Sequence, residues 1–162
     1  MFSRRSLLHR YALEDLRELG CTVDEIDNNI VYVKYYIHPE SNPDTQFKLK
    51  YTYHRDNHGG FFIDRIRPYS LPLGRFETEE EIVKFILKDI ELFSNAVNSN
   101  NFPEFVELGN RIETFKHSFE SFFLHKNVET GDLRNISNEI LSIIERIEAL
   151  SKKRKDIIIE EE

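Results

Sequence analysis

Hydrophobic and polar positions alternate along two stretches in the first half of the chain. In residues 30–38 and 46–54, every second position is apolar or aromatic, and the positions between them carry mainly Tyr, Lys, Thr and His. A period of two is typical of a β-strand with one buried face. A third short apolar run, 61–67, ends at Pro68. Because loops rich in Pro, Asn and Gly separate these runs, the pattern predicts a three-stranded antiparallel meander.

Helical spacing flanks the predicted strands on both sides. Leu8, Ala12 and Leu16 follow one another at intervals of four, which predicts a helix that ends before Gly20. After the strands, Thr78 and the three glutamates that follow it match a capping box, in which the first and fourth residues satisfy each other's backbone N–H groups. Apolar residues then recur at helical intervals as far as Val97, so a second helix is predicted there.

The most regular pattern lies in the last third of the chain, where apolar residues recur at alternating intervals of three and four. This is the heptad pattern of helices that pack along one edge. The first series is Phe105, Leu108, Ile112, Phe115, Phe119 and Phe122, and the second is Leu133, Ile136, Ile140, Ile143, Ile147 and Leu150. A short loop, 126–131, separates two helices of about 20 residues each. We therefore expect them to be antiparallel neighbours.

Together these patterns predict an α+β fold. We expect an N-terminal helix and a three-stranded antiparallel meander, followed by a three-helix segment that ends in a long antiparallel helical hairpin. The expected domains are a small α+β sheet domain at residues 1–76, a helical bundle or hairpin at 77–155, and a tail at 156–162.

Composition narrows the class of protein. The 13 Phe and 7 Tyr among 162 residues argue against a disordered chain. No apolar run approaches the roughly 20 residues that span a bilayer, and residues 1–10 lack the apolar stretch of a secretory signal. Cys21 is the only cysteine, which excludes an intramolecular disulfide and a cysteine-based zinc site. We expect a cytoplasmic protein without a membrane partner.

Charge is unevenly distributed along the chain, whose net charge is −7. Residues 1–76 carry 11 Lys/Arg and 10 Asp/Glu, whereas residues 77–162 carry 11 and 19. The near-neutral first half therefore has room for a basic surface, although acidic, solvated helix faces are common and are the simpler explanation of the difference.

One face of the predicted sheet is a candidate binding surface. Arg65 and Arg67, two residues apart, fall on the same face whichever way the third strand is turned. The candidate anion- or partner-binding face consists of Tyr32, Lys34, Tyr36, Lys48, Lys50, Arg65 and Arg67. Single-stranded nucleic acid uses such surfaces, with cations for phosphates and rings for bases. Lys and Tyr are also ordinary residues of a solvated strand, so both interpretations stay open.

The loop after the second predicted strand contains a weak metal-site candidate. His54, Asp56 and His58 alternate there, and imidazole with carboxylate suits transition metals. A loop rich in His, Asp, Asn and Gly is more often a simple turn. Elsewhere no phosphate-binding, nucleophile-elbow or metalloprotease motif is present, and Cys21 has no neighbour that would activate it. We name no catalytic residue and expect no cofactor.

These observations favour a non-enzymatic interaction or regulatory protein. Six phenylalanines concentrate in the first helix of the hairpin, and each buried ring removes about 150–250 Å² from water. Two helices cannot cover so much apolar surface, so it packs elsewhere in the chain or against a second copy. We expect a homodimer formed through the C-terminal helices, with a protein partner on the sheet. Nucleic-acid or anionic-ligand binding on the sheet is one alternative, and a small metal-dependent hydrolase is the other.

Overall fold

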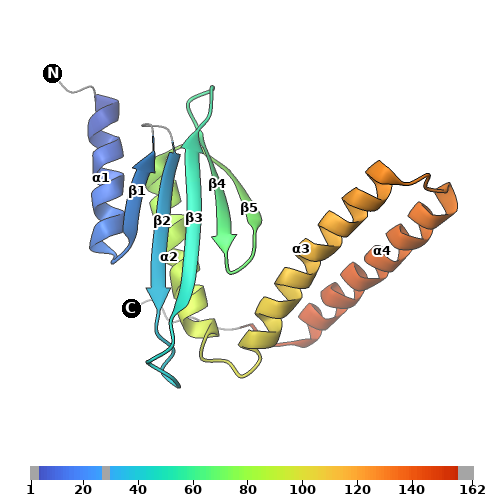
Figure 1. Ribbon diagram of the computed structural model, residues 1–162. Coiled ribbons are helices and arrows are strands. Elements are labelled where there is room, and N and C mark those ends of the chain that lie inside the picture. The colour runs from blue at the N-terminus through green and yellow to red at the C-terminus, as the bar shows by residue number, and fades with distance from the viewer. Residues whose placement is uncertain (1–3, 27–29, 157–162) are drawn as a thin grey trace. The chain divides into compact units, whose positions relative to one another are not determined.

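The structure is a computed structural model that describes residues 4–26 and 30–156 (Figure 1). Within these residues it contains four helices and a five-stranded antiparallel sheet, which confirms the α+β class. In chain order the elements are α1 (Arg4–Glu18), β1 (Thr22–Ile26), β2 (Ile30–Ile37), β3 (Phe47–Arg55), β4 (Phe61–Arg67), β5 (Leu71–Phe76), α2 (Glu79–Ala96), α3 (Phe102–His125) and α4 (Thr130–Lys153).

The chain forms two compact units, residues 1–113 and 114–162. The first unit contains α1, the sheet, α2 and the beginning of α3, and the second contains the end of α3 and α4. The domain boundary expected at residue 76 therefore lies inside the first unit, because the apolar stripe of α2 belongs to the same core as the strands. Of the expected tail, residues 157–162 lie outside the described residues.

The sheet is a meander of five strands in the order β1-β2-β3-β4-β5, where the sequence predicted three. β1 lies between α1 and β2, and β5 follows Pro68, two segments in which the alternation of apolar and polar residues predicted no strand. Both missed strands lie at an edge of the sheet. The pairing of β5 with β4 is irregular, and Gly74 has a φ of +108° that favours glycine. An edge strand tolerates Pro72 because one side of it makes no ladder hydrogen bonds.

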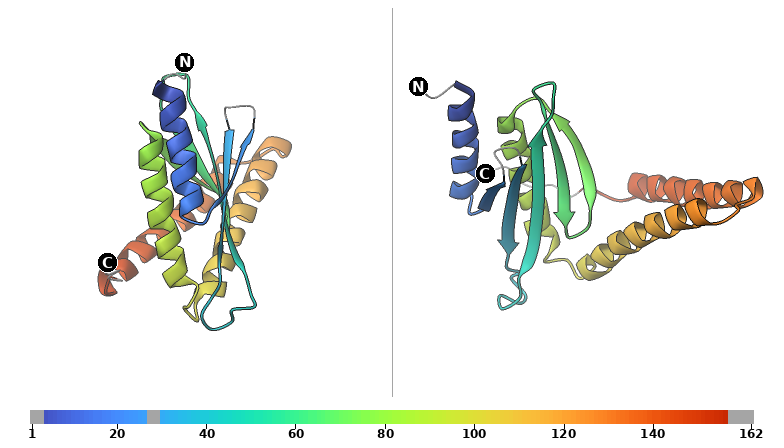
Figure 2. Two further views of the ribbon diagram at one scale, coloured as in Figure 1. Left: turned by 90° about the vertical axis from the view of Figure 1, so that its left-hand side faces the viewer. Right: turned by 45° about the horizontal axis from the view of Figure 1, so that its top comes forward.

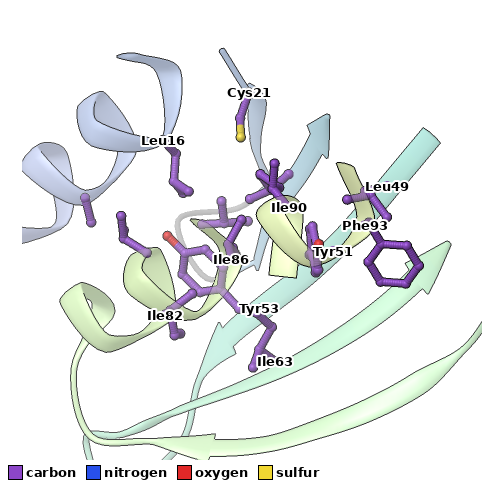
Figure 3. Packing of buried hydrophobic residues seen from close by; sticks show 14 of the residues in the cluster. Leu16, Cys21, Leu49, Tyr51, Tyr53, Ile63, Ile82, Ile86, Ile90 and Phe93 are labelled. Carbon is purple, nitrogen blue, oxygen red and sulfur yellow. The ribbon is translucent and has the colours of Figure 1, made fainter. Parts of the chain in front are cut away.

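Two helices, α1 and α2, lie side by side against one face of the sheet (Figure 2). The core forms where their apolar stripes meet the inward residues of the strands. On α2, Ile82, Ile86 and Ile90 are buried, and on β3 Leu49 and Tyr51 face them from the sheet (Figure 3). The opposite face of the sheet is not covered by these two helices.

The capping box predicted at the start of α2 is present. The Thr78 hydroxyl accepts a hydrogen bond from the backbone N–H of Glu81 at 3.2 Å, and the Glu81 carboxylate accepts one from the backbone N–H of Thr78 at 3.3 Å. Two backbone donors that would lack an intrahelical partner are thereby satisfied. The helix that completes the core consequently begins at a defined residue.

Among the described residues, no helix combines the length and the apolar character needed to cross a bilayer.

Candidate functional site

The open face of the sheet collects the basic and aromatic side chains of β2 and β3. Within each strand, alternation directs Val31, Val33 and Leu49 into the core and leaves the intervening residues on the other side. Tyr32, Lys34, Tyr36, Lys48 and Lys50 therefore share one face, as the period of two predicted. We call this surface the open face; its other β2 and β3 members are Ile30, Thr52 and His54.

Arg65 and Arg67 do not share a face, which corrects the sequence-based expectation. The β3–β4 register pairs Tyr51 with Arg65 but Lys50 with Arg67, so Ile66 is an extra residue in a β-bulge. Directly opposite residues lie on the same face of a sheet. The bulge thus sends Arg65 into the core with Tyr51 and leaves Arg67 exposed on the open face beside Lys50. A strict period of two cannot reveal such an insertion.

The buried Arg65 forms an ion pair with Asp89 of α2. Its Nη1 atom donates to both carboxylate oxygens at 2.9 Å, and the hydroxyl of Tyr51 donates to the same carboxylate at 2.7 Å. The guanidinium also lies over the rings of Tyr69 and Phe93, 5.0 and 4.8 Å from their centroids. Burial and the negative charge of Asp89 raise the pKa of Tyr51. Arg65 is therefore a core residue that ties β3, β4 and α2 together.

A second polar cluster joins α1 to α2 and the sheet. The carboxylate of Glu79 accepts from Tyr53 at 3.1 Å and lies 2.6 Å from His9 Nδ1, while His9 Nε2 lies 3.2 Å from Glu25 of β1. Partial burial alone would lower the pKa of His9, but the hydrogen bonds and charges of Glu79 and Glu25 outweigh it, and that pKa is raised. The helix-covered face thus contains two Tyr–carboxylate pairs that sequence reasoning missed. Asp89 was a sequence signal for one pair, because it interrupts the apolar stretch of α2, whereas Glu79 is one of three successive glutamates at the helix start.

The candidate metal residues do not form a coordination site. Asp56 accepts hydrogen bonds from the backbone N–H groups of His58 and Gly60, at 2.8 and 2.9 Å, and its other oxygen accepts one from Arg75 at 2.6 Å. The Arg75 guanidinium lowers the pKa of Asp56. His54 instead stacks on Phe62, with ring centroids 5.9 Å apart. Within residues 4–26 and 30–156, no three His, Cys, Asp or Glu side chains are grouped to hold a metal ion.

Cys21 is buried in the core, and burial raises the pKa of its thiol to about 11. A thiol that resists ionisation is a poor nucleophile. It therefore packs as a small apolar residue.

Two of the cavities formed by the described residues lie in the first unit. One, of about 320 Å³, lies beside α1 and the start of α2 and is lined by residues including Leu8, Tyr11 and Glu79. The other, of about 430 Å³, lies beside Phe47 and Phe102. Glu79, the buried carboxylate of the first cavity, is already hydrogen-bonded to His9 and Tyr53. This buried carboxylate is therefore committed to the contact between α1, α2 and the sheet.

The helical seam is divided between the two units. Phe105, Leu108 and Ile112 belong to the first unit, and Phe115, Phe119 and Phe122 belong to the second, together with the whole series on α4. In the first unit, α3 packs closely on the connection between β4 and β5. A Cβ atom at Gly109 would stand 2.5 Å from the Tyr69 ring, so only glycine fits there.

In the second unit the seam is largely uncovered. Phe115 and Phe119 stack with their ring centroids 6.2 Å apart, and both are exposed. On α4, Leu133 and Ile136 are half-buried, whereas Ile143 and Ile147 are 59% and 61% exposed. Of the other predicted seam residues, Phe122 is half-buried and Ile140 is 37% exposed.

Comparisons of the chain with protein-family models, with curated proteins and with solved structures find no match. The features of the molecule that bear on its function are the open face and the exposed seam of the second unit.

Proposed function

We propose that this protein is a non-enzymatic interaction protein that self-associates as a homodimer through the helices of its second unit and binds a partner on the open face of its sheet. The observation that carries the proposal is the exposure of the α4 seam. Monomeric proteins rarely expose contiguous apolar patches larger than a few hundred Å², and larger ones mark interaction sites.

Exposure of the seam increases along α4 with distance from the loop that joins it to α3. Leu133 and Ile136, near the loop, are half-buried, whereas Ile143 and Ile147 are 59% and 61% exposed. α3 and α4 have 24 residues each, so a difference in helix length does not account for this exposure. An additional apolar neighbour would cover the exposed part of the seam.

The apolar stripe of α4 is wider than a two-stranded coiled coil needs. Ile140, Ile143 and Ile147 occupy the heptad seam, and Leu141 and Ile144 extend the stripe to one side, both of them exposed. A stripe broader than the seam positions is typical of a helix with more than one neighbour, as in a bundle. A second copy supplies two such helices, and a two-fold axis makes the same surface serve both partners.

Charge at the ends of α4 favours an antiparallel arrangement of two copies. Glu129 and Asp132 lie at its start, and Lys152 and Lys153 lie in its last turn, followed by Arg154. Antiparallel pairing places the acidic start of one α4 beside the basic end of the other. Such complementarity sets register and orientation more than it adds affinity. A cytoplasmic location, where a lone buried thiol stays reduced, is part of the same proposal.

The test is sedimentation velocity on the full chain and on a matched pair of variants. Ile143→Glu introduces a charge into the seam, and Asn138→Glu introduces the same charge at an exposed position of α4 outside it. We expect a dimer for the unmodified chain and for Asn138→Glu, and a monomer for Ile143→Glu. A chain that is strictly monomeric at tens of micromolar overturns the self-association, as does an equal response of the two variants.

A further inference from the structure

Three basic residues lie in one row across the open face. The strand registers place Lys34 of β2 directly opposite Lys50 of β3, and Lys50 directly opposite Arg67 of β4. Adjacent strands are about 4.8 Å apart, so the three positions span only about 10 Å. Like charges directly opposite one another destabilise a sheet. A row that brings them together is understandable if an anion neutralises it.

Carboxylates of the described residues neutralise only part of this row: Asp24 and Asp64 share the open face, because they pair with Tyr32 and Thr52. Lys34 donates to Asp24 of β1 at 2.7 Å, whereas Lys50 and Arg67 have no carboxylate partner in the described part of the chain. Lys48 adds a fourth cation one row away, opposite Tyr36. The four cations Lys34, Lys48, Lys50 and Arg67 outnumber the carboxylates of Asp24 and Asp64, so this part of the open face is basic although the whole chain has a net charge of −7. A local excess of this kind attracts an anion to one side of an acidic protein.

Aromatic rings accompany the cations. The Nζ atoms of Lys48 and Lys50 lie 5.3 and 5.1 Å from the ring centroids of Tyr36 and Tyr32. Tyr36 is 40% exposed, and Phe62 of β4, which stacks with His54, is 41% exposed. From the Tyr36–Lys48 row to the His54–Phe62 row, the surface extends about 20 Å along the strands. Flat rings beside cations are suited to a ligand that has both planar groups and negative charges.

Resting on the proposed role of the open face as a partner surface, we propose that the partner is single-stranded nucleic acid. Its phosphates lie along Lys34, Lys50 and Arg67, and its bases stack on Tyr36 and Phe62. Unpaired bases offer the stacking faces that a duplex hides, and base–aromatic stacking is tolerant of sequence. An acidic peptide would use the cations but has no need of the rings, so the surface favours nucleic acid.

The test measures fluorescence anisotropy of labelled oligothymidylate and oligouridylate of about 12 nucleotides, a length within the range that a single binding fold covers. We expect binding that weakens with salt, with a logarithmic slope of about −0.7 for each phosphate neutralised. Lys50→Gln should reduce the magnitude of that slope by about 0.7. Lys88→Gln is the matched control, because Lys88 is an exposed lysine of α2, which covers the other face.

Stacking is tested separately from charge. Tyr36→Ala should weaken binding by about 5- to 150-fold, which corresponds to the loss of one stacked base. Tyr11→Ala, at an exposed tyrosine of α1, should leave the affinity unchanged. Far-UV circular dichroism shows whether each variant is folded; all four substituted side chains are at least partly exposed.

The proposal is overturned if neither oligonucleotide binds at low salt, or if Lys50→Gln and Lys88→Gln have the same effect. It is also overturned if a polyglutamate peptide binds in a Lys50-dependent way while oligonucleotides do not, because the partner is then an acidic protein. Light scattering on the same samples keeps the two proposals separate. A monomeric chain that binds oligonucleotides contradicts only the self-association, and a dimer that does not bind them contradicts only this inference.

Discussion

Helices α2 and α4 carry equally regular apolar stripes, but their surroundings differ. Ile86 of α2 is 0% exposed because the sheet and α1 cover it, whereas Ile143 of α4 is 59% exposed. The two helices also differ at their starts and in their polar contacts, since α2 has a capping box and a buried ion pair with the sheet. Helical periodicity therefore shows which face of a helix is apolar. The rest of the fold determines whether the chain itself buries that face.

The largest loss of stability is expected when the buried ion pair between α2 and the sheet is disrupted. Asp89→Asn leaves the charge of Arg65 buried without a counter-charge, and we expect a loss of about 3–5 kcal/mol in the free energy of unfolding. All seven tyrosines lie at or before residue 69, so tyrosine fluorescence during urea unfolding monitors the first unit alone.

A double variant is the control for that prediction. Arg65→Met combined with Asp89→Leu removes both charges, and it should be less destabilised than Asp89→Asn. A loss of less than about 1 kcal/mol for Asp89→Asn contradicts the view that this contact ties α2 to the sheet.

A matched pair of isoleucine substitutions tests the comparison directly. Ile86→Ala should destabilise the first unit by about 2–5 kcal/mol, because it removes buried contacts and leaves a cavity. Ile143→Ala should change the same tyrosine-monitored transition by less than about 0.5 kcal/mol, because its side chain is exposed in the other unit. Equal losses of stability for the two substitutions would contradict the finding that the first unit buries Ile86 whereas Ile143 is exposed.

Substitutions at the first residues of α2 and α4 should have smaller effects of opposite sign on stability. Thr78→Ala removes the capping box of α2 and should cost about 1 kcal/mol in tyrosine-monitored unfolding. In α4 the N-cap residue Glu129 makes no side-chain capping bond. Glu129→Ser should stabilise α4 by up to about 1 kcal/mol, measured as increased helical circular dichroism during thermal unfolding. A gain of helix stability in Thr78→Ala would contradict the cap assigned to α2.

The smallest expected effect is the pH dependence that His9 contributes where α1 meets α2. The folded-state pKa of His9 is raised above its ordinary 6.5 by Glu79 and Glu25, against the effect of burial. Its stabilisation is therefore fully present below pH 6.5 and is lost as the pH rises through the raised pKa. We expect a change of less than about 1 kcal/mol, because the cluster is partly open to solvent.

His9→Gln identifies the part of the pH profile that belongs to this side chain. Urea midpoints are measured by tyrosine fluorescence from below pH 6.5 to above the raised pKa of His9. They should depend less on pH in the variant than in the unmodified chain. Identical profiles exclude His9 as the source of the effect.

Local periodicity was sufficient to predict much of this protein. The period of two along β2 and β3 predicted which residues form the open face, and the intervals of three and four predicted α3 and α4. The capping box at Thr78 was also readable, because it depends on residues three positions apart. All of these features arise from backbone geometry over a few residues, which the order of amino acids along the chain largely determines.

Non-local contacts decided what the sequence did not reveal. The bulge at Ile66, which separates Arg65 from Arg67, depends on how β4 pairs with β3, and strands β1 and β5 exist because neighbouring strands offer hydrogen-bond partners. The cover over Ile86 and the exposure of Ile143 depend on which elements meet in space. A side-chain pattern states which face is apolar, but only the assembled tertiary structure determines what lies against that face, because those contacts join residues far apart along the chain.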